Sequence, residues 1–450
     1  MIGAEKINER LSEALALELG DQAEAVFLGS DSGLTRFANS TIHQNVAETQ
    51  SKVFFRVIRG KKIGVASTNS LARGDLKRAY RLAARIARSQ KENPDFVSLP
   101  GPATYPTIDT HVDTTARLTP RQRAMKVRTV IREAARKNCT VAGSFASGAD
   151  EIAVINTLGV SAHQVMTTAS LSVIAMTGNS SGYAQGFSRN VDDIDARAIA
   201  KQAAATAARC ANPEDVPPGD YQVVLEPVAV AGLLEWLNYI GFGSKAMHEQ
   251  TSFLAGHVGE KITGDTITIY DDANDPAGIA MPFDFEGVPK RRVELVTDGV
   301  AKGAVYDSLW ARRAETQSTG HALTPDNAGE GALPLNVFMA GGDSSLERMI
   351  AAVDEGLLVT RFHYINGFLD TPKAVLTGMT RDGLMRIKNG RVVGGAKNLR
   401  FTDSMLRAFE SVRGLSSERQ LAPSWWDAVG CICVPAMRLG SFRFSGKTEF

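Results

Sequence analysis

A proline-rich segment at residues 212–221 is the sequence feature that most constrains the fold of this 450-residue chain. Prolines, a glycine and acidic residues stand there between a segment with a helical pattern and a segment with a strand pattern, which is typical of a linker. The chain is long enough for two or three domains with cores of their own. We therefore expect one domain at residues 1–212 and a second at residues 213–450.

The part before the linker mixes helices with strands. Helical patterns cover residues 4–19 and 192–211. Residues 52–57 and 62–66 alternate with a two-residue period on either side of a turn, which predicts a hairpin. Residues 31–39 are expected to form a turn followed by an edge strand.

The part after the linker is rich in strand patterns. An apolar helix follows Pro227, and the strongest turn signals are Asp-Gly and Asn-Gly at residues 381–383 and 388–390, where we expect successive hairpins. Helices followed by strands, rather than strict alternation, predict an α+β fold. We expect a two-lobed molecule with an N-terminal mixed α/β lobe and a β-rich C-terminal lobe whose sheets are largely antiparallel.

Charge and composition exclude several classes of partner. The formal net charge of +1 gives no global electrostatic reason to bind nucleic acid or an anionic membrane. No run of 18 apolar residues is present, and the charged N-terminal segment has the pattern of an amphipathic helix rather than a signal peptide. The four cysteines form neither a C-x-x-C pair nor a zinc ribbon, so we interpret them as reduced thiols of a cytoplasmic protein.

A metallopeptidase-like pair, His248-Glu249, lacks the second histidine that a helical zinc site needs. Two imidazoles on one helix bind the same zinc only if they share a face, as in H-E-x-x-H or, with a modest distortion, H-E-x-x-x-H. The next histidine is His257, near the back face of a regular helix. A zinc site made of His248 and His257, with Glu249 as the general base, therefore requires a break in the helix.

Ordered landmarks along nearly the whole chain resemble the TldD/PmbA family, whose members are also called modulators of DNA gyrase. The first is TSFLAGHVGEK at residues 251–261, which is followed by a strand pattern at residues 267–272. The other landmarks are TRFAN at 35–39, GVASTN at 64–69, PPGDYQVVLEP at 217–227, STGH at 318–321, LTG at 376–378 and VP at 434–435. Each landmark is weak alone, and their combination is specific.

This resemblance implies a partnership between two kinds of subunit. TldD-type members carry H-E-x-x-x-H on the long helix before the Thr-Ser-Phe-like segment, and a cysteine near the C-terminus is a further zinc ligand. PmbA-type members, also called TldE, lack these ligands and pair with a TldD-type subunit. Together the two cleave unfolded peptides inside an enclosed chamber.

Carried over by position, the zinc motif should lie before Thr251, at residues 231–243. That window contains Glu235 but no histidine, and a general base without a metal has no activated water to deprotonate. Cys431 and Cys433 lie near the C-terminal cysteine of the family without clearly matching it. The chain is thus similar to the PmbA/TldE side, with no cofactor of its own and with zinc expected on a TldD-type partner.

A loop of the second domain is the candidate peptide-binding site. An extended peptide is held through its backbone by strand edges and adaptable polar loops. The candidate residues of this loop are Trp310, Arg312, Ser318, Thr319, Gly320 and His321. An ordinary connection between two strands is the alternative interpretation.

We therefore predict a PmbA/TldE-type subunit of a TldD/TldE-like zinc metallopeptidase that binds and encloses unfolded peptide for proteolysis or peptide maturation. Its partner would be a TldD-type subunit in a heterodimer or a second copy in a homodimer. One alternative is a stand-alone metallopeptidase that uses His248, Glu249 and His257, with Cys431 or Cys433 as a third ligand. Another is a non-catalytic homodimeric interaction protein that contacts gyrase or another client.

Overall fold

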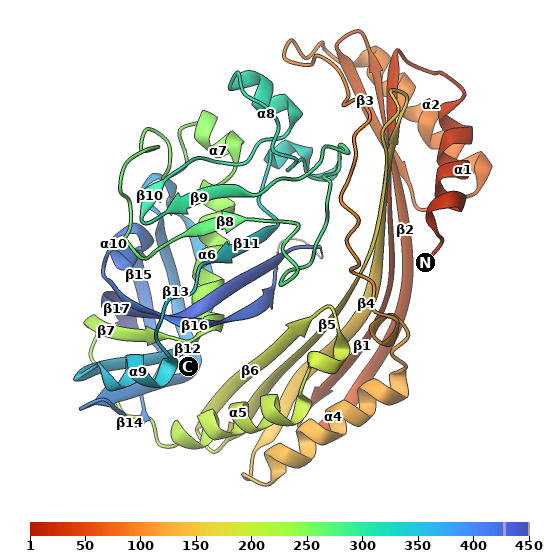
Figure 1. Cartoon of the computed structure of the whole chain (residues 1–450). Helices are drawn as coiled ribbons and strands as arrows, with labels where there is room; N and C mark the ends of the chain where they lie inside the picture. The colour runs from red at the N-terminus through yellow and green to blue at the C-terminus, as the bar shows by residue number, and fades with distance from the viewer. Residues whose placement is uncertain (426–428, 449–450) are drawn as a thin grey trace.

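The computed structural model of the chain describes residues 1–425 and 429–448. The described residues form a six-stranded sheet from the part before the linker and an eleven-stranded sheet from the part after it. Figure 1 shows the long strands of the first sheet curving along one side of the second lobe. Helices are present in both lobes and most strand pairs are antiparallel, which confirms the expected α+β fold.

The first lobe is built on an antiparallel sheet in the order β3-β2-β1-β4-β5-β6. Its strands are β1 (Gln22–Ala38), β2 (Thr41–Arg59), β3 (Lys62–Thr68), β4 (Thr140–Asn156), β5 (Ser161–Thr177) and β6 (Ser180–Ser188). Its helices are α1 (Ala4–Leu15), α2 (Arg73–Ser89), α3 (Asp113–Ala116), α4 (Pro120–Ala135), η1 (Val191–Asp193) and α5 (Ala196–Arg209).

The two faces of this sheet have different neighbours. On the outer face, α1 and α2 bury Phe27 and Phe55, while α4 and α5 bury Phe145. On the inner face, Val26 and Phe54 share a core with side chains of the second lobe. Because successive side chains of a strand point to opposite faces, Val26 packs on the second lobe while its neighbour Phe27 packs under the helices. The lobes are therefore joined through an apolar core.

The sheet of the second lobe closes partly on itself. The strands β7, β12, β13, β15 and β17 pair in a ring, because β17 pairs with β7 as well as with β15, and β8 to β11 extend the sheet from β17. The strands are β7 (Gly219–Leu225), β8 (Ile269–Asp271), β9 (Val293–Thr297), β10 (Val300–Ala301), β11 (Asn336–Met339), β12 (Glu355–Asp370), β13 (Val375–Lys388), β14 (Arg391–Gly395), β15 (Leu399–Ser404), β16 (Val412–Pro423) and β17 (Cys431–Lys447).

A buried helix, α6, packs against β12 and β17 and shares the largest apolar core of the molecule with them. The helices of this lobe are α6 (Pro227–Gly241), α7 (Ser244–His248), α8 (Ser308–Arg313), η2 (Ala328–Glu330), α9 (Leu346–Ala351), η3 (Thr371–Lys373) and α10 (Met405–Glu410). Among the described residues, no helix combines the length and the hydropathy needed to cross a membrane.

Two turns that the sequence predicts, at residues 31–39 and 381–383, are absent from the structure. Residues 31–39 lie within or just after β1, which continues to Ala38 and pairs with β2 on one side and β4 on the other, so the turn and edge strand predicted there are wrong. Residues 381–383 form a bulge inside β13, where Asp382 and Gly383 have φ of +52° and +136°. The same residue types that favour a hairpin also satisfy a bulge. The hairpin at residues 388–390 is confirmed, since Lys388 pairs with Arg391.

Candidate functional site

Helix α6 lies where the resemblance places the zinc motif. It begins at Pro227, a residue that fits the first turn because the N–H it lacks would have no partner there. Glu235, the acidic residue of this helix, is only 4% exposed. Its carboxylate accepts hydrogen bonds from the Ser424 hydroxyl and from the Trp425 N–H, the latter at 3.1 Å. Glu235 therefore ties α6 to the segment that precedes β17.

The histidine positions of H-E-x-x-x-H, counted around Glu235, are occupied by Leu234 and Tyr239. Leu234 is fully buried in the core and has no donor atom for a metal. Tyr239 donates its hydroxyl proton to Glu330 at 3.2 Å, and burial raises the pKa of this phenol above its ordinary value. A protonated phenol and a leucine do not form a zinc site.

Aromatic rings surround Tyr239 in place of metal ligands. The Trp236 ring lies 6.2 Å from the Tyr239 ring and 5.4 Å from the Phe368 ring, in edge-on geometry. The Trp425 ring lies 6.1 Å from Tyr239 and 5.4 Å from Trp236. Phe368 and Trp425 are 60% and 51% exposed, so this aromatic cluster of Trp236, Tyr239, Phe368 and Trp425 reaches the surface.

The two C-terminal cysteines lie inside the protein on β17. Cys431 donates a hydrogen bond from Sγ to the Asn336 Oδ1 atom at 3.2 Å. Burial raises the pKa of both thiols, Cys431 and Cys433, above the ordinary value. Since a thiolate is the form that binds zinc, burial in apolar surroundings works against metal binding by either cysteine.

The residues of the alternative zinc site face different neighbours. The His248 ring lies 5.3 Å from the Trp310 ring at the end of α7, and Glu249 is exposed directly after that helix. The Nδ1 atom of His257 lies 2.7 Å from Oε2 of Glu260. In residues 1–425 and 429–448, no group of three or more His, Cys, Asp or Glu side chains is arranged to hold a metal ion.

The first half of the candidate peptide-binding loop forms α8. Asp307 caps this helix by accepting a hydrogen bond from the Trp310 N–H at 2.7 Å. Trp310 is buried, and the Arg313 guanidinium lies 4.4 Å from its ring centre. Arg312 is exposed and lines a cavity between the two lobes. Of Trp310 and Arg312, the two predicted peptide contacts on α8, only Arg312 has an exposed side chain that can reach a ligand.

The second half of the loop is held by internal hydrogen bonds. Ser318 and Thr319 bond through their hydroxyls to the backbone of Tyr306, and the Tyr306 N–H donates to Thr319 at 2.7 Å. Gly320 has φ of +76°, and a Cβ atom there would lie 2.5 Å from the carbonyl oxygen of Pro289. Ser318 is partly exposed, whereas Thr319 and Gly320 are buried. These residues fix the loop against its neighbours.

His321 is the most deeply buried residue of the loop. Its Nε2 atom lies 2.8 Å from Oδ1 of Asp271, and neither side chain is exposed. Burial lowers the pKa of His321 further than Asp271 raises it, so the ring is neutral in the folded protein. Burial alone would raise the pKa of Asp271, but His321, Lys290 and the Asn336 N–H outweigh it and lower that pKa. The neutral imidazole therefore donates from Nε2 to an ionised Asp271.

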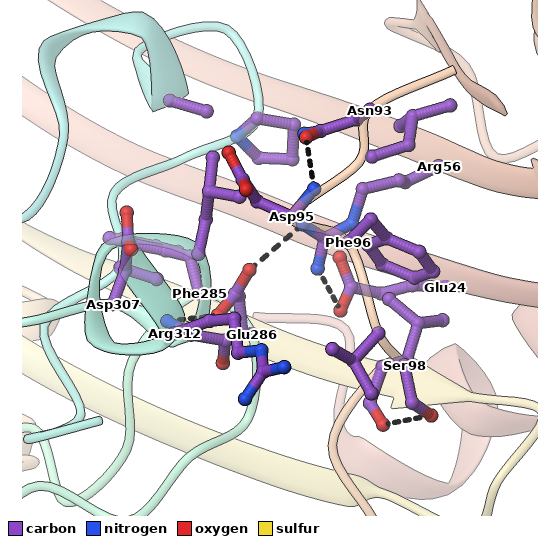
Figure 2. Close-up of a pocket in the computed structure, with 18 of the residues that line it drawn as sticks. Glu24, Arg56, Asn93, Asp95, Phe96, Ser98, Phe285, Glu286, Asp307 and Arg312 are labelled. Carbon is purple, nitrogen blue, oxygen red and sulfur yellow. Dashed lines mark hydrogen bonds and ion pairs between the residues drawn. The ribbon is translucent and has the colours of Figure 1, made fainter. Parts of the chain in front are cut away.

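A cavity between the lobes is lined by charged residues that no sequence pattern indicates as a site. Glu24 and Arg56 are direct neighbours on β1 and β2, and Arg56 also reaches Glu286 of the second lobe, each ion pair at 2.9 Å (Figure 2). Glu24 and Arg56 lie on strands and Glu286 lies in a turn, and a sequence pattern alone assigns such charged residues to solvent. The contact between the lobes buries them instead.

Family models match most of the chain. The PmbA/TldA metallopeptidase C-terminal domain matches residues 218–446, the central domain matches residues 115–211 and domain 1 matches residues 23–87. The boundary between the second and third matches falls in the linker that separates the two sheets.

Individual relatives agree with these matches. A metalloprotease TldD homolog of Haemophilus influenzae is 23% identical over 62% of this chain and 61% of its own length. The metalloprotease PmbA of Escherichia coli is 32% identical over 26% of this chain and 24% of its own length. The chain thus spans about three fifths of the length of the first relative and about a quarter of the length of the second. The crystal structure of TldE from Thermococcus kodakarensis shares the fold, with a TM-score of 0.88, 22% identity, and coverage of 98% of this chain and 100% of that chain.

Proposed function

Because this chain belongs to the PmbA/TldD metallopeptidase family, we propose that it is a PmbA/TldE-type subunit that lacks a zinc site and acts beside a zinc-carrying TldD-type subunit. The observation that carries this proposal is the surroundings of Glu235, where Leu234 and Tyr239 stand at the positions that the motif requires for histidine. Zinc bound on the partner would supply the activated water. The residues of this chain would contribute to peptide binding.

An unpaired strand edge supports binding of extended peptides. Strand β2 pairs with β1 over residues 41–58, but β3 covers only residues 53–59 of its other side. Among the described residues, no strand pairs with the outer edge of residues 41–52, and most side chains there are polar and exposed. An extended peptide adds to such an edge through backbone hydrogen bonds, which do not depend on its side chains. We propose this edge as the principal peptide-binding element.

The aromatic cluster supports a role in contacting apolar side chains of the same peptides. Phe368 and Trp425 expose more than half of their surface, although large aromatic side chains usually lie inside proteins. Exposed apolar surface of this kind marks sites of interaction. From the predicted loop, Arg312 and Ser318 remain proposed peptide contacts, because their side chains are at least partly exposed.

The four cysteines support the proposal of a cytoplasmic protein. All four are buried and free of disulfides. Free buried thiols are typical of proteins that stay in a reducing compartment.

Reconstituted peptide cleavage tests the proposed function. The purified chain, a purified TldD-type subunit and their mixture are each incubated with an unfolded, fluorescently labelled polypeptide. We expect no cleavage by this chain alone, and more cleavage by the mixture than by the TldD-type subunit alone. Substitution of the motif glutamate on the TldD-type subunit should abolish cleavage by the mixture. Metal-dependent cleavage by this chain alone would contradict the proposal and favour a stand-alone peptidase.

A further inference from the structure

The cavity between the lobes has the size of a small-ligand site. Its volume is about 190 Å³, with walls from β1, β2, β3 and the segment after α2 on one side and from residues 285–328 on the other. An apolar cavity of about 150 Å³ can take up benzene. The cavity therefore has room for a short alkyl chain or a small ring that carries a polar group.

Two polar atoms of residues that line the cavity, Oε1 of Glu24 and Nε of Arg56, have no hydrogen-bond partner among the described residues. Arg56 donates to Oε2 of Glu24 and to Oε1 of Glu286, so one guanidinium serves two carboxylates. The Glu24 side chain is fully buried, and its Oε1 atom has no hydrogen-bond partner among the described residues. A buried carboxylate oxygen without a partner is costly, and a ligand with N–H donors would remove that cost.

The other walls match a ligand with an apolar body. Val65, Leu99, Leu309 and Leu323 line the cavity along with Phe96. Aliphatic and aromatic walls with a few polar groups are typical of small-molecule sites. The ligand should therefore carry its N–H donors at the end of a short hydrocarbon chain.

We propose that this cavity binds an organic cation, a primary ammonium or a guanidinium on a short apolar chain, with Glu24 as its acceptor. A lysine or arginine side chain of a peptide and a free alkylamine share this chemistry. The proposed subunit function does not require this site, and the site requires neither zinc nor a partner subunit.

The ionisation of Glu24 couples binding to pH. Burial raises the pKa of Glu24 to about 7 in the free protein. A bound cation favours the ionised carboxylate, so binding at neutral pH releases a proton and weakens as the pH falls from 8 to 6. The other charged groups of the cavity are Arg56 on β2, Asp95 after α2, Glu286, and Asp307 and Arg312 at α8. Asp95 already forms an ion pair with Arg313 at 2.7 Å.

Calorimetric titration of the purified chain tests the proposal. The probes are Nα-acetyl-lysine amide, n-butylamine and, as a neutral control of similar shape, Nα-acetyl-norleucine amide. We expect the lysine probe to bind at least about tenfold more tightly than the norleucine probe, as a charge-assisted hydrogen bond implies. Binding of butylamine as well would assign the site to amines in general, and binding of the lysine probe alone would assign it to peptide side chains.

Three variants identify the site of binding. Glu24→Gln should weaken binding of the lysine probe at least about tenfold. Ala328→Phe, at an exposed residue that lines the cavity, should block binding without changing the free energy of unfolding. The exposed Glu249→Gln is the control and should bind like the wild type. Absence of binding by both amines, equal binding of the norleucine probe, or unchanged binding in folded Glu24→Gln or Ala328→Phe would overturn the proposal.

Discussion

At the scale of single residues, His321 shows how burial determines what a side chain can do. The ring is fixed between Asp271 and Thr319, with hydrogen-bond distances of 2.8 Å and 2.9 Å. This geometry resembles a relay of Asp, His and Thr, but the Thr319 hydroxyl is bonded to the Tyr306 backbone and is buried. The three residues therefore stabilise the loop around them.

Replacing His321 should destabilise the fold. His321→Ala leaves the Oδ1 atom of Asp271 without its buried donor, and we expect a loss of about 3 kcal/mol in the free energy of unfolding. Urea denaturation at pH 7 measures the loss. The matched control is His257→Ala, an exposed histidine paired with Glu260, which should change the free energy by less than about 0.5 kcal/mol. Equal losses in the two variants would contradict a stabilising role of the buried pair of His321 and Asp271.

The pH dependence of this contribution has a definite sign. The folded-state pKa of His321 is lowered, so the unfolded chain takes up a proton near pH 6.5 that the folded chain does not. The contribution is present above pH 6.5 and is lost as the pH falls below it. We expect the stability difference between the wild type and His321→Ala to shrink between pH 7 and pH 5, as measured by urea denaturation. A difference that grows over this range would show a charged imidazole in the folded state.

Glu235 should be dispensable for peptide cleavage. In the complex with a TldD-type subunit, Glu235→Gln should leave kcat/KM within about threefold of the wild type, since its carboxylate bonds to Ser424 and Trp425 rather than activating water. The measurement is steady-state cleavage of a labelled peptide. The matched substitution of the motif glutamate on the partner should abolish cleavage. A large loss of kcat in Glu235→Gln would place Glu235 in the catalytic machinery.

At the scale of helices and strands, the sequence predicts the type of an element better than the residues at which that element begins and ends. The hairpin of β2 and β3 and the helix after Pro227 follow directly from alternation and from the position of proline. The length of β1 could not be predicted, because Gly33 and polar neighbours resemble a turn until pairing with β2 and β4 supplies backbone partners on both sides. Secondary structure at such positions is decided by partners distant in the sequence.

The outer edge of β2 should bind unfolded peptide, and a pair of proline substitutions tests this. Adjacent residues of a strand point their N–H groups in opposite directions. We therefore compare Ala47→Pro and Glu48→Pro. One of the two variants should lose a backbone hydrogen bond to β1 and should be less stable than the wild type. The other should lose only the N–H group that points away from β1, and its free energy of unfolding should stay unchanged. Fluorescence anisotropy with a labelled unfolded peptide measures binding. We expect the stable variant to bind more weakly, and wild-type affinity in that variant would exclude this edge as the site.

At the scale of the whole molecule, the contact between the lobes explains why the candidate sites were only partly predictable. The prediction that this chain lacks the zinc motif of the family rests on the pattern around Glu235, because ligand spacing is a local property of a helix. The cluster of Glu24, Arg56 and Glu286 joins three segments far apart in the chain. No local pattern indicates such a cluster, since each residue separately resembles a solvated polar position.

Buried acids should make the protein more stable at pH 6 than at pH 8. Burial raises the pKa of Glu24, Glu226 and Asp284 to about 7 and that of Asp307 to about 6. Their contribution is complete below the unfolded pKa of about 4 and is lost as the pH rises through the folded values. We expect the free energy of unfolding to fall by about 1–4 kcal/mol from pH 6 to pH 8, as measured by urea denaturation. Glu24→Gln should reduce this fall. A rise in the free energy of unfolding toward pH 8 would contradict the raised pKa values of these buried acids.

The zinc content of the purified chain shows whether this subunit carries a metal site of its own. Metal analysis by mass spectrometry is carried out on this chain alone, on a TldD-type subunit alone and on the complex of the two. We expect no stoichiometric zinc in this chain alone and one zinc in each heterodimer, unchanged by His248→Ala. One zinc in each chain measured alone, lost in His248→Ala, would contradict this expectation and establish a rearranged metal site in this subunit.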